Sequence, residues 1–240
     1  MSYDDINRGS GQIASAEAGV IDAGLRAYML RVYNYMAGGL AVTGIVAYAS
    51  VATGLYQSIA GTALIWVVML APLAFVLVLS FGIARMSAAT AAIVFVVYAA
   101  VMGLSLGAIF LVYTGASIAR VFFITAATYG AMSLYGYTTK SDLSGFGSFL
   151  MMGLIGIVIA SLVNIFVGSS ALQFAISVIG VLVFVGLTAY DTQRIKEMYL
   201  ESDSAEIVDK KAVMGALALY LDFINLFMML LQLFGQRRDN

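Results

Sequence analysis

The sequence predicts an all-α fold, a polytopic membrane bundle of seven transmembrane helices. Of its 240 residues, 62% are hydrophobic and only 10% are charged, whereas soluble domains carry about a quarter charged residues. Seven stretches also reach the roughly 20 apolar residues that a helix needs to cross a bilayer. The last of them carries small and polar residues along one face. These three observations indicate a membrane protein whose final helix lies at the centre of the bundle.

The seven predicted segments follow one another with short connections. The exception is a charged loop of about twenty residues, Thr192 to Ala212, before the last segment. The only proline, Pro72, predicts a kink in the second segment. Glycines of the third, fifth and sixth segments predict close helix contacts, and the tyrosines of the fourth predict packing aromatics. The predicted segments cover residues 32–53, 62–83, 88–112, 118–138, 147–168, 171–190 and 213–234.

The chain before the first segment is too acidic and polar for a secretory signal peptide, as Asp4, Asp5 and Glu17 illustrate. We therefore divide the protein into a hydrophilic cytoplasmic tail, residues 1–27, and a transmembrane domain, residues 28–240.

The basic residues predict an orientation with the N-terminus in the cytoplasm. Lys and Arg are enriched in cytoplasmic loops, and this orientation places nine inside and three outside. An alternative is a re-entrant last segment, which would leave both ends in the cytoplasm. The inner set is Arg8, Arg26, Arg31, Arg85, Lys140, Arg194, Lys196, Lys210 and Lys211, and the outer set is Arg120, Arg237 and Arg238.

Composition excludes several kinds of chemistry. The chain has no cysteine and no histidine, so it forms no disulfide or thiolate site, and proton sensing would have to use carboxyl groups. The scattered basic residues argue against a nucleic-acid partner. The acidic loop residues lack the spacing of a calcium-binding loop, and we expect neither a cofactor nor a permanent metal site.

The last segment carries the most informative residue, Asp222, which has no other charged residue around it from 213 to 234. An acid at bilayer depth is costly and usually functional, although a neutral acid that only fixes helix register is the alternative. Steps of three and four residues place it on one helical face with small and polar groups. That face comprises Gly215, Ala218, Asp222, Asn225, Met229 and Gln232.

A second acid, Asp191, ends the sixth segment three residues before Arg194, with which a simple ion pair is the alternative to a functional role. Asp191 and Asp222 can meet only if the sixth helix runs deeper, or the seventh starts later, than hydropathy indicates. If they meet, they cannot both ionise cheaply, and one proton would be shared. Arg85, after the second segment, is either a topology anchor or a latch for Asp191.

Three sequence strings carry a resemblance to a known family. LYLDFINLF around Asp222, YDTQ around Asp191 and TTKSDLSGFG from Thr138 to Gly147 resemble the Bax inhibitor-1 family. The similarity covers nearly the whole chain after the tail, and the first string is the specific one.

The resemblance implies seven helices, six of them surrounding the last, and a pH-sensitive calcium leak across a bacterial inner membrane. It implies that Asp191 and Asp222 form the proton-sensing pair and transient calcium contacts, with Arg85 as the closed-state latch. Spans one to three hold no acidic residue, which puts calcium conduction in question more than the pH pair.

Two other functions are considered. One is a non-conducting regulator of a membrane-anchored AAA+ protease or another membrane complex, for which the N-terminal tail would be the handle. The other is an intramembrane aspartyl protease. Such enzymes carry Gly-x-Gly-Asp where this chain has Leu219-Tyr220-Leu221-Asp222, and a Pro-Ala-Leu string that cannot occur after Pro72 here. We therefore expect no enzymatic activity.

Overall fold

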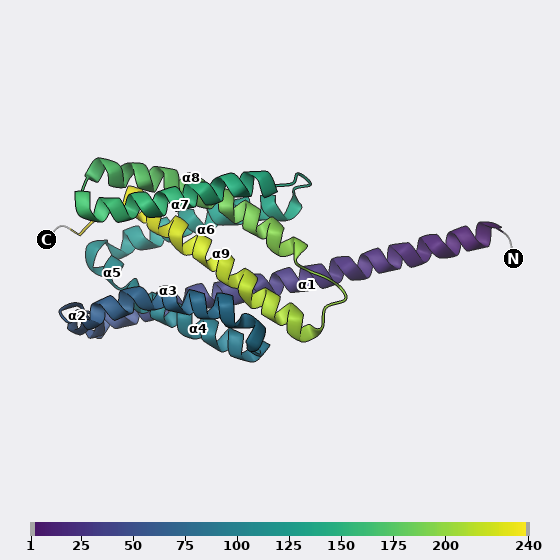
Figure 1. The fold of residues 1–240 in the computed structure, drawn as a ribbon, viewed down its shortest axis with the longest axis horizontal. Coiled ribbons are helices and arrows are strands. Elements are labelled where there is room, and N and C mark those ends of the chain that lie inside the picture. The colour runs from purple at the N-terminus through teal and green to yellow at the C-terminus, as the bar shows by residue number, and fades with distance from the viewer. Residues whose placement is uncertain (1–2, 239–240) are drawn as a thin grey trace.

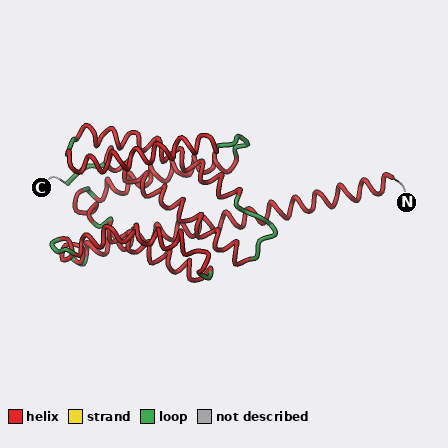
Figure 2. The backbone as a smooth tube through the Cα atoms, viewed as in Figure 1, coloured by secondary structure: helices red, strands yellow, loops and turns green. Residues whose placement is uncertain are grey.

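A computed structural model describes the backbone of residues 3–238 and the side chains of residues 23–238. Every element in this range is helical, and Figure 2 shows that the connections are short. The elements are α1 (Tyr3–Ala52), α2 (Leu55–Ala60), α3 (Leu64–Gly82), η1 (Ile83–Arg85), α4 (Ala88–Ser105), α5 (Ala108–Val112), α6 (Gly115–Thr138), α7 (Ser144–Val167), α8 (Ser170–Glu197) and α9 (Ala205–Phe234).

Seven helical stretches within residues 3–238 are long and apolar enough to cross a membrane. This confirms the predicted all-α polytopic bundle. Seven is an odd number of crossings, and accordingly the start of α1 and the end of α9 lie at opposite ends of the molecule in Figure 1. The first crossing, Ala23–Ala52, is the second part of α1. The tail predicted for residues 1–27 lies largely outside the described side chains, and its boundary stays a prediction.

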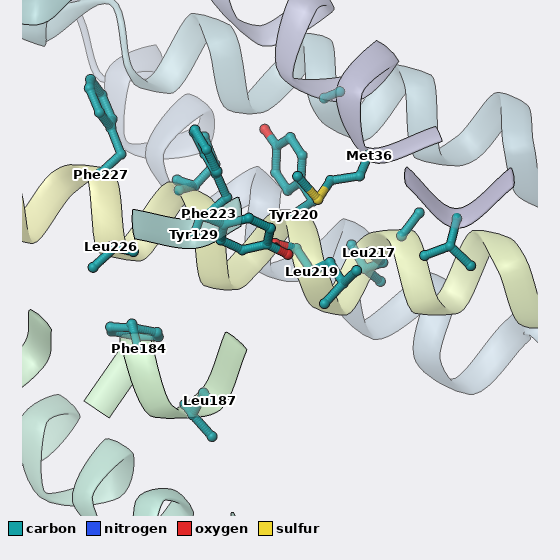
Figure 3. Packing of buried hydrophobic residues seen from close by; sticks show 14 of the residues in the cluster. Met36, Tyr129, Phe184, Leu187, Leu217, Leu219, Tyr220, Phe223, Leu226 and Phe227 are labelled. Carbon is teal, nitrogen blue, oxygen red and sulfur yellow. The ribbon is translucent and has the colours of Figure 1, made fainter. Parts of the chain in front are cut away.

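The C-terminal helix α9 lies at the centre of the bundle. It packs directly against α1, α4, α6 and α8, while α3 packs on α4 and α7 packs on α8 as an outer layer. Figure 3 shows Met36 of α1, Tyr129 of α6 and Phe184 of α8 around the row of α9 side chains. α9 is one unbroken helix of 30 residues, which is about 45 Å long at 1.5 Å per residue and long enough for a full crossing.

The prediction of a long charged loop before α9 is wrong. α8 continues to Glu197 and α9 begins at Ala205, so the connection is only residues 198–204. Hydropathy missed these extensions because they are amphipathic: their charged residues are exposed or half-buried, while Ile195 and Val213 pack into the core. Ser204 caps α9 by accepting a hydrogen bond from the backbone N–H of Ile207 at 3.4 Å.

The third predicted segment is not one continuous helix. It consists of α4 and the short α5, with a break at Leu106 and Gly107. Gly107 lies so close to the Tyr56 ring that a Cβ atom there would approach a ring carbon to 2.6 Å. The close approach of Tyr56 to this break requires glycine at position 107.

Candidate functional site

The deeper course of α8 places Asp191 inside a helix rather than at its end. The turn that follows is well packed, because Thr192 and Gln193 are both buried. The Gln193 side chain accepts a hydrogen bond from the Leu143 N–H and donates one to the Ser141 carbonyl, both at 2.8 Å. These bonds tie α8 to the connection between α6 and α7. The sequence indicated that the two acids could meet only if the sixth helix ran deeper or the seventh started later than hydropathy suggests. α8 does run deeper.

Asp222 lies near the middle of α9 with 5% of its surface exposed. Its carboxyl group lies close to that of Asp191, on the wall of the same cavity. Two ionised carboxylates offer no donor, so this contact becomes a hydrogen bond only when a proton lies between them. Among the residues with described side chains, no hydrogen-bond partner contacts the buried Asp222 Oδ2 atom. The geometry thus fits a pair that holds one proton.

The basic residue beside this pair is Arg194. It lies one turn after Asp191 and on the wall of the same cavity, without forming an ion pair within 4 Å among the described side chains. Arg85 is elsewhere: it is exposed at the end of η1 and does not line the cavity. The structure therefore brings Asp191, Asp222 and Arg194 together and leaves Arg85 outside.

A cavity of about 540 Å³ lies between α7, α8 and α9 and is lined by both acids. Four residues of the polar face of α9 form one wall: Ala218, Asp222, Asn225 and Met229. A smaller adjoining cavity of about 150 Å³ is lined by Gly215, Ala218, Asp191 and Arg194. Since both cavities share Asp191 and Arg194, Asp191 lies where they adjoin, whereas Asp222 lines only the larger one.

The polar face of α9 ends in a hydrogen-bond network away from the acids. Gln232 Oε1 accepts from Gln173 Nε2 at 2.7 Å and from Ser177 Oγ at 2.8 Å. Asn164 of α7 donates to Gln173 Oε1 at 3.1 Å. These bonds join α7, α8 and α9 at the end of the bundle near the C-terminus.

Tyr129 of α6 also belongs to the surroundings of the pair. Its hydroxyl donates to the Leu219 carbonyl at 3.2 Å, one turn before Asp222, and its ring packs edge-on against Phe223. The sequence indicated only a packing aromatic. Nothing in its spacing separates it from Tyr135, which is exposed.

Calcium requires six to eight oxygen ligands, several of them usually carboxylates. The part of the chain with described side chains holds no group of three or more acidic residues that could bind a metal ion. Two carboxylates could contact a passing ion, and the transient calcium contacts stay a prediction.

The family model described as "Inhibitor of apoptosis-promoting Bax1" matches residues 25–239. The chain belongs to the Bax inhibitor-1 family.

Relatives within the Bax inhibitor-1 family align almost end to end. Inner membrane protein YbhL of Escherichia coli K12 is 51% identical over 220 residues, which cover 90% of this chain and 94% of that protein. Protein RP147 of Rickettsia prowazekii is 51% identical over 219 residues, which cover 91% of this chain and 93% of that protein. A membrane protein of Streptococcus pyogenes is 37% identical over 225 residues, covering 90% and 95%. With its seven apolar helices, this family member is an integral membrane protein.

Proposed function

We propose that this protein is a pH-sensitive cation leak pathway, for calcium above all, in a bacterial inner membrane with the N-terminus in the cytoplasm. The observation that carries the proposal is the proximity of Asp191 and Asp222 on the wall of one cavity between α7, α8 and α9. Ionisable residues at this depth typically mark ion pathways or proton relays.

The pair would work as a switch because its charge depends on the number of bound protons. With one shared proton the pair carries one negative charge, and Arg194 is the nearby counter-charge. A second proton would remove that charge and leave Arg194 without an attraction to the bundle interior. We therefore expect the α8–α9 contact to loosen, and the leak to increase, as the pH falls. A latch by Arg85 would require η1 to move.

The polar face of α9 would provide the path for the ion. Asn225 donates its amide N–H to the Leu221 carbonyl at 2.8 Å, which leaves its own carbonyl oxygen available in the cavity. Carboxylate and amide oxygens are the ligands that hard cations prefer. In this state, the network around Gln232 holds the three helices together at the far end.

Calcium flux into proteoliposomes between pH 8 and pH 6 tests the proposal. Wild-type protein should leak faster at the lower pH, and Asp222→Asn should leak at a rate that no longer depends on pH. Asp142→Asn is the matched control, because Asp142 is an exposed acid in the α6–α7 connection. An Asp222→Asn protein with unchanged rate and pH profile would contradict the gating. Wild-type vesicles without flux at any pH would contradict the leak itself.

A regulator of a membrane-anchored AAA+ protease is the second candidate. The observation that favours it is the N-terminal part of α1, which Figure 1 shows extending as a helix beyond the bundle. Deletion of residues 2 to 25 separates the two functions. If the truncated protein no longer affects protease turnover but still conducts ions, the result supports the regulator as an additional role. If the truncation also abolishes ion flux, the result does not support a separate regulatory role.

A further inference from the structure

A second large cavity lies away from the acid pair, as a groove of about 520 Å³ between α1 and α6. α1 packs on α4 and α9, and α6 packs on α8 and α9, so the two helices flank the groove without packing closely on each other. The Tyr33 hydroxyl bridges them by a hydrogen bond of 2.6 Å to Ser133 Oγ. Because these two hydroxyl groups bond to each other, the surface that the groove presents is almost entirely apolar.

The groove opens to the lipid side of the bundle. Leu30 on one wall and Leu134 on the other are 53% and 63% exposed, both within membrane-spanning stretches. Gly130 leaves open space on the α6 wall, since a Cβ atom there would have no other atom within 4 Å. The groove is therefore wide enough to be filled from the bilayer.

The length of the groove matches one leaflet. Its α1 wall runs from Arg26 to Met36, ten residues that rise about 15 Å. This is half of the roughly 30 Å hydrocarbon core. An extended acyl chain that enters at the Arg26 end would reach the deep end near Met36.

The two ends of the groove differ in charge. Arg26 lies exposed at the shallow end, and no acidic side chain among the described residues lines the groove. Tyr137 lines the same end, and its backbone carbonyl accepts a hydrogen bond from Lys196 Nζ at 2.9 Å. A second cation is thus held beside that end. Basic pockets between transmembrane helices at the membrane surface favour anionic headgroups.

We propose that the groove between α1 and α6 binds an anionic phospholipid, with one acyl chain along Leu30 and Gly130 and the phosphate at Arg26. The apolar walls, the leaflet-long depth and the cationic entrance together select this occupant. The bound lipid would fill the gap between α1 and α6. This inference does not depend on the leak function.

Quenching of tryptophan fluorescence by brominated lipids tests the proposal directly. The chain has a single tryptophan, Trp66, which is 65% exposed on α3 and serves as the reporter for ordinary lipid contact. A second reporter combines Trp66→Phe with Leu134→Trp to place the indole on the groove wall. Each is reconstituted in vesicles with brominated phosphatidylglycerol or brominated phosphatidylcholine of the same chain length.

We expect the groove reporter to prefer phosphatidylglycerol roughly fivefold, the effect of one basic residue near a phosphate, and Trp66 to show no preference. Arg26→Gln should abolish the preference and Arg26→Lys should keep it. Arg120→Gln, an exposed arginine of the other end of α6, is the charge control and should change nothing.

A second pair of variants tests occupancy by the acyl chain. Gly130→Leu adds an apolar side chain at a groove position where a Cβ atom meets nothing within 4 Å, and it should abolish the preference, whereas Gly156→Leu, at an equally open position on α7, should not. Equal preference at both reporters, or a preference that survives Arg26→Gln and Gly130→Leu, would overturn the proposal.

Discussion

α3 and α9 are both long apolar helices of one bundle, but they bury different kinds of residue. In the most apolar stretch of α3 only 17% of the residues are buried, against 67% in α9. α3 nevertheless has the higher hydropathy of the two. In a bilayer, apolar side chains gain little from leaving lipid, so small and polar residues mark the helix that is packed inside protein. Four predictions test how much the packed interior contributes relative to exposed positions, from the largest expected effect to the smallest.

The largest effect is expected at Gly215 of α9. A Cβ atom there would come to 2.9 Å from a side-chain carbon of Ile195 on α8, so Gly215→Leu overpacks the contact and should cost about 3 kcal/mol. Gly38→Leu on α1, where a Cβ meets no atom within 4 Å, is the control. Reversible unfolding in mixed micelles measures both. Equal loss in the two variants would show that α9 is not tightly packed.

Removal of a buried side chain should have the next largest effect. Leu219 of α9 is fully buried, whereas Leu73 of α3 is 64% exposed. We expect Leu219→Ala to lower the free energy of unfolding by about 2 kcal/mol, because it leaves a cavity. Leu73→Ala should change it by less than about 0.5 kcal/mol. A larger loss for Leu73→Ala would reverse the comparison.

The hydrogen bonds of Gln232 should contribute less. Gln232→Leu removes its bonds to Gln173 and Ser177, and interhelical hydrogen bonds in membranes are worth about 0.6 kcal/mol each. We expect a small but measurable loss of stability in the same unfolding assay. A Gln232→Leu, Gln173→Leu double variant should lose less than the sum of the single variants, and strict additivity would show that the two side chains do not interact.

The smallest effect is expected outside the membrane. Hydrogen bonds from the Ser144 hydroxyl and backbone N–H lower the pKa of Asp142 below its ordinary value. Its contribution to stability is therefore present above the ordinary carboxyl range and lost as the pH falls through the lowered pKa. Asp142→Asn should alter the pH dependence of the unfolding midpoint only in acid. A change near neutral pH would contradict this assignment.

Sequence patterns predicted the number of crossings and the central place of α9, because length and helical periodicity determine both. They did not predict the packed ends of α8 and α9, since charges at residues 194–211 lower the hydropathy of helices that continue beyond the membrane. Helical spacing offered Arg194 as an ion-pair partner of Asp191, and the family resemblance implied Arg85 as a latch. The structure places Arg194 nearer, because proximity depends on helix rotation and on where α8 ends. Tyr129 could not be distinguished from the other tyrosines in the sequence, because the rotation of α6 decides which of them faces α9.

Infrared spectroscopy of the carboxyl groups tests the central claim most directly. If Asp191 and Asp222 share one proton, reconstituted protein at neutral pH should show the C=O stretch of a protonated carboxyl group, and either Asp191→Asn or Asp222→Asn should shift or remove it. Absence of that band in the wild-type protein, or a band unaffected by both substitutions, would show that the two acids titrate independently.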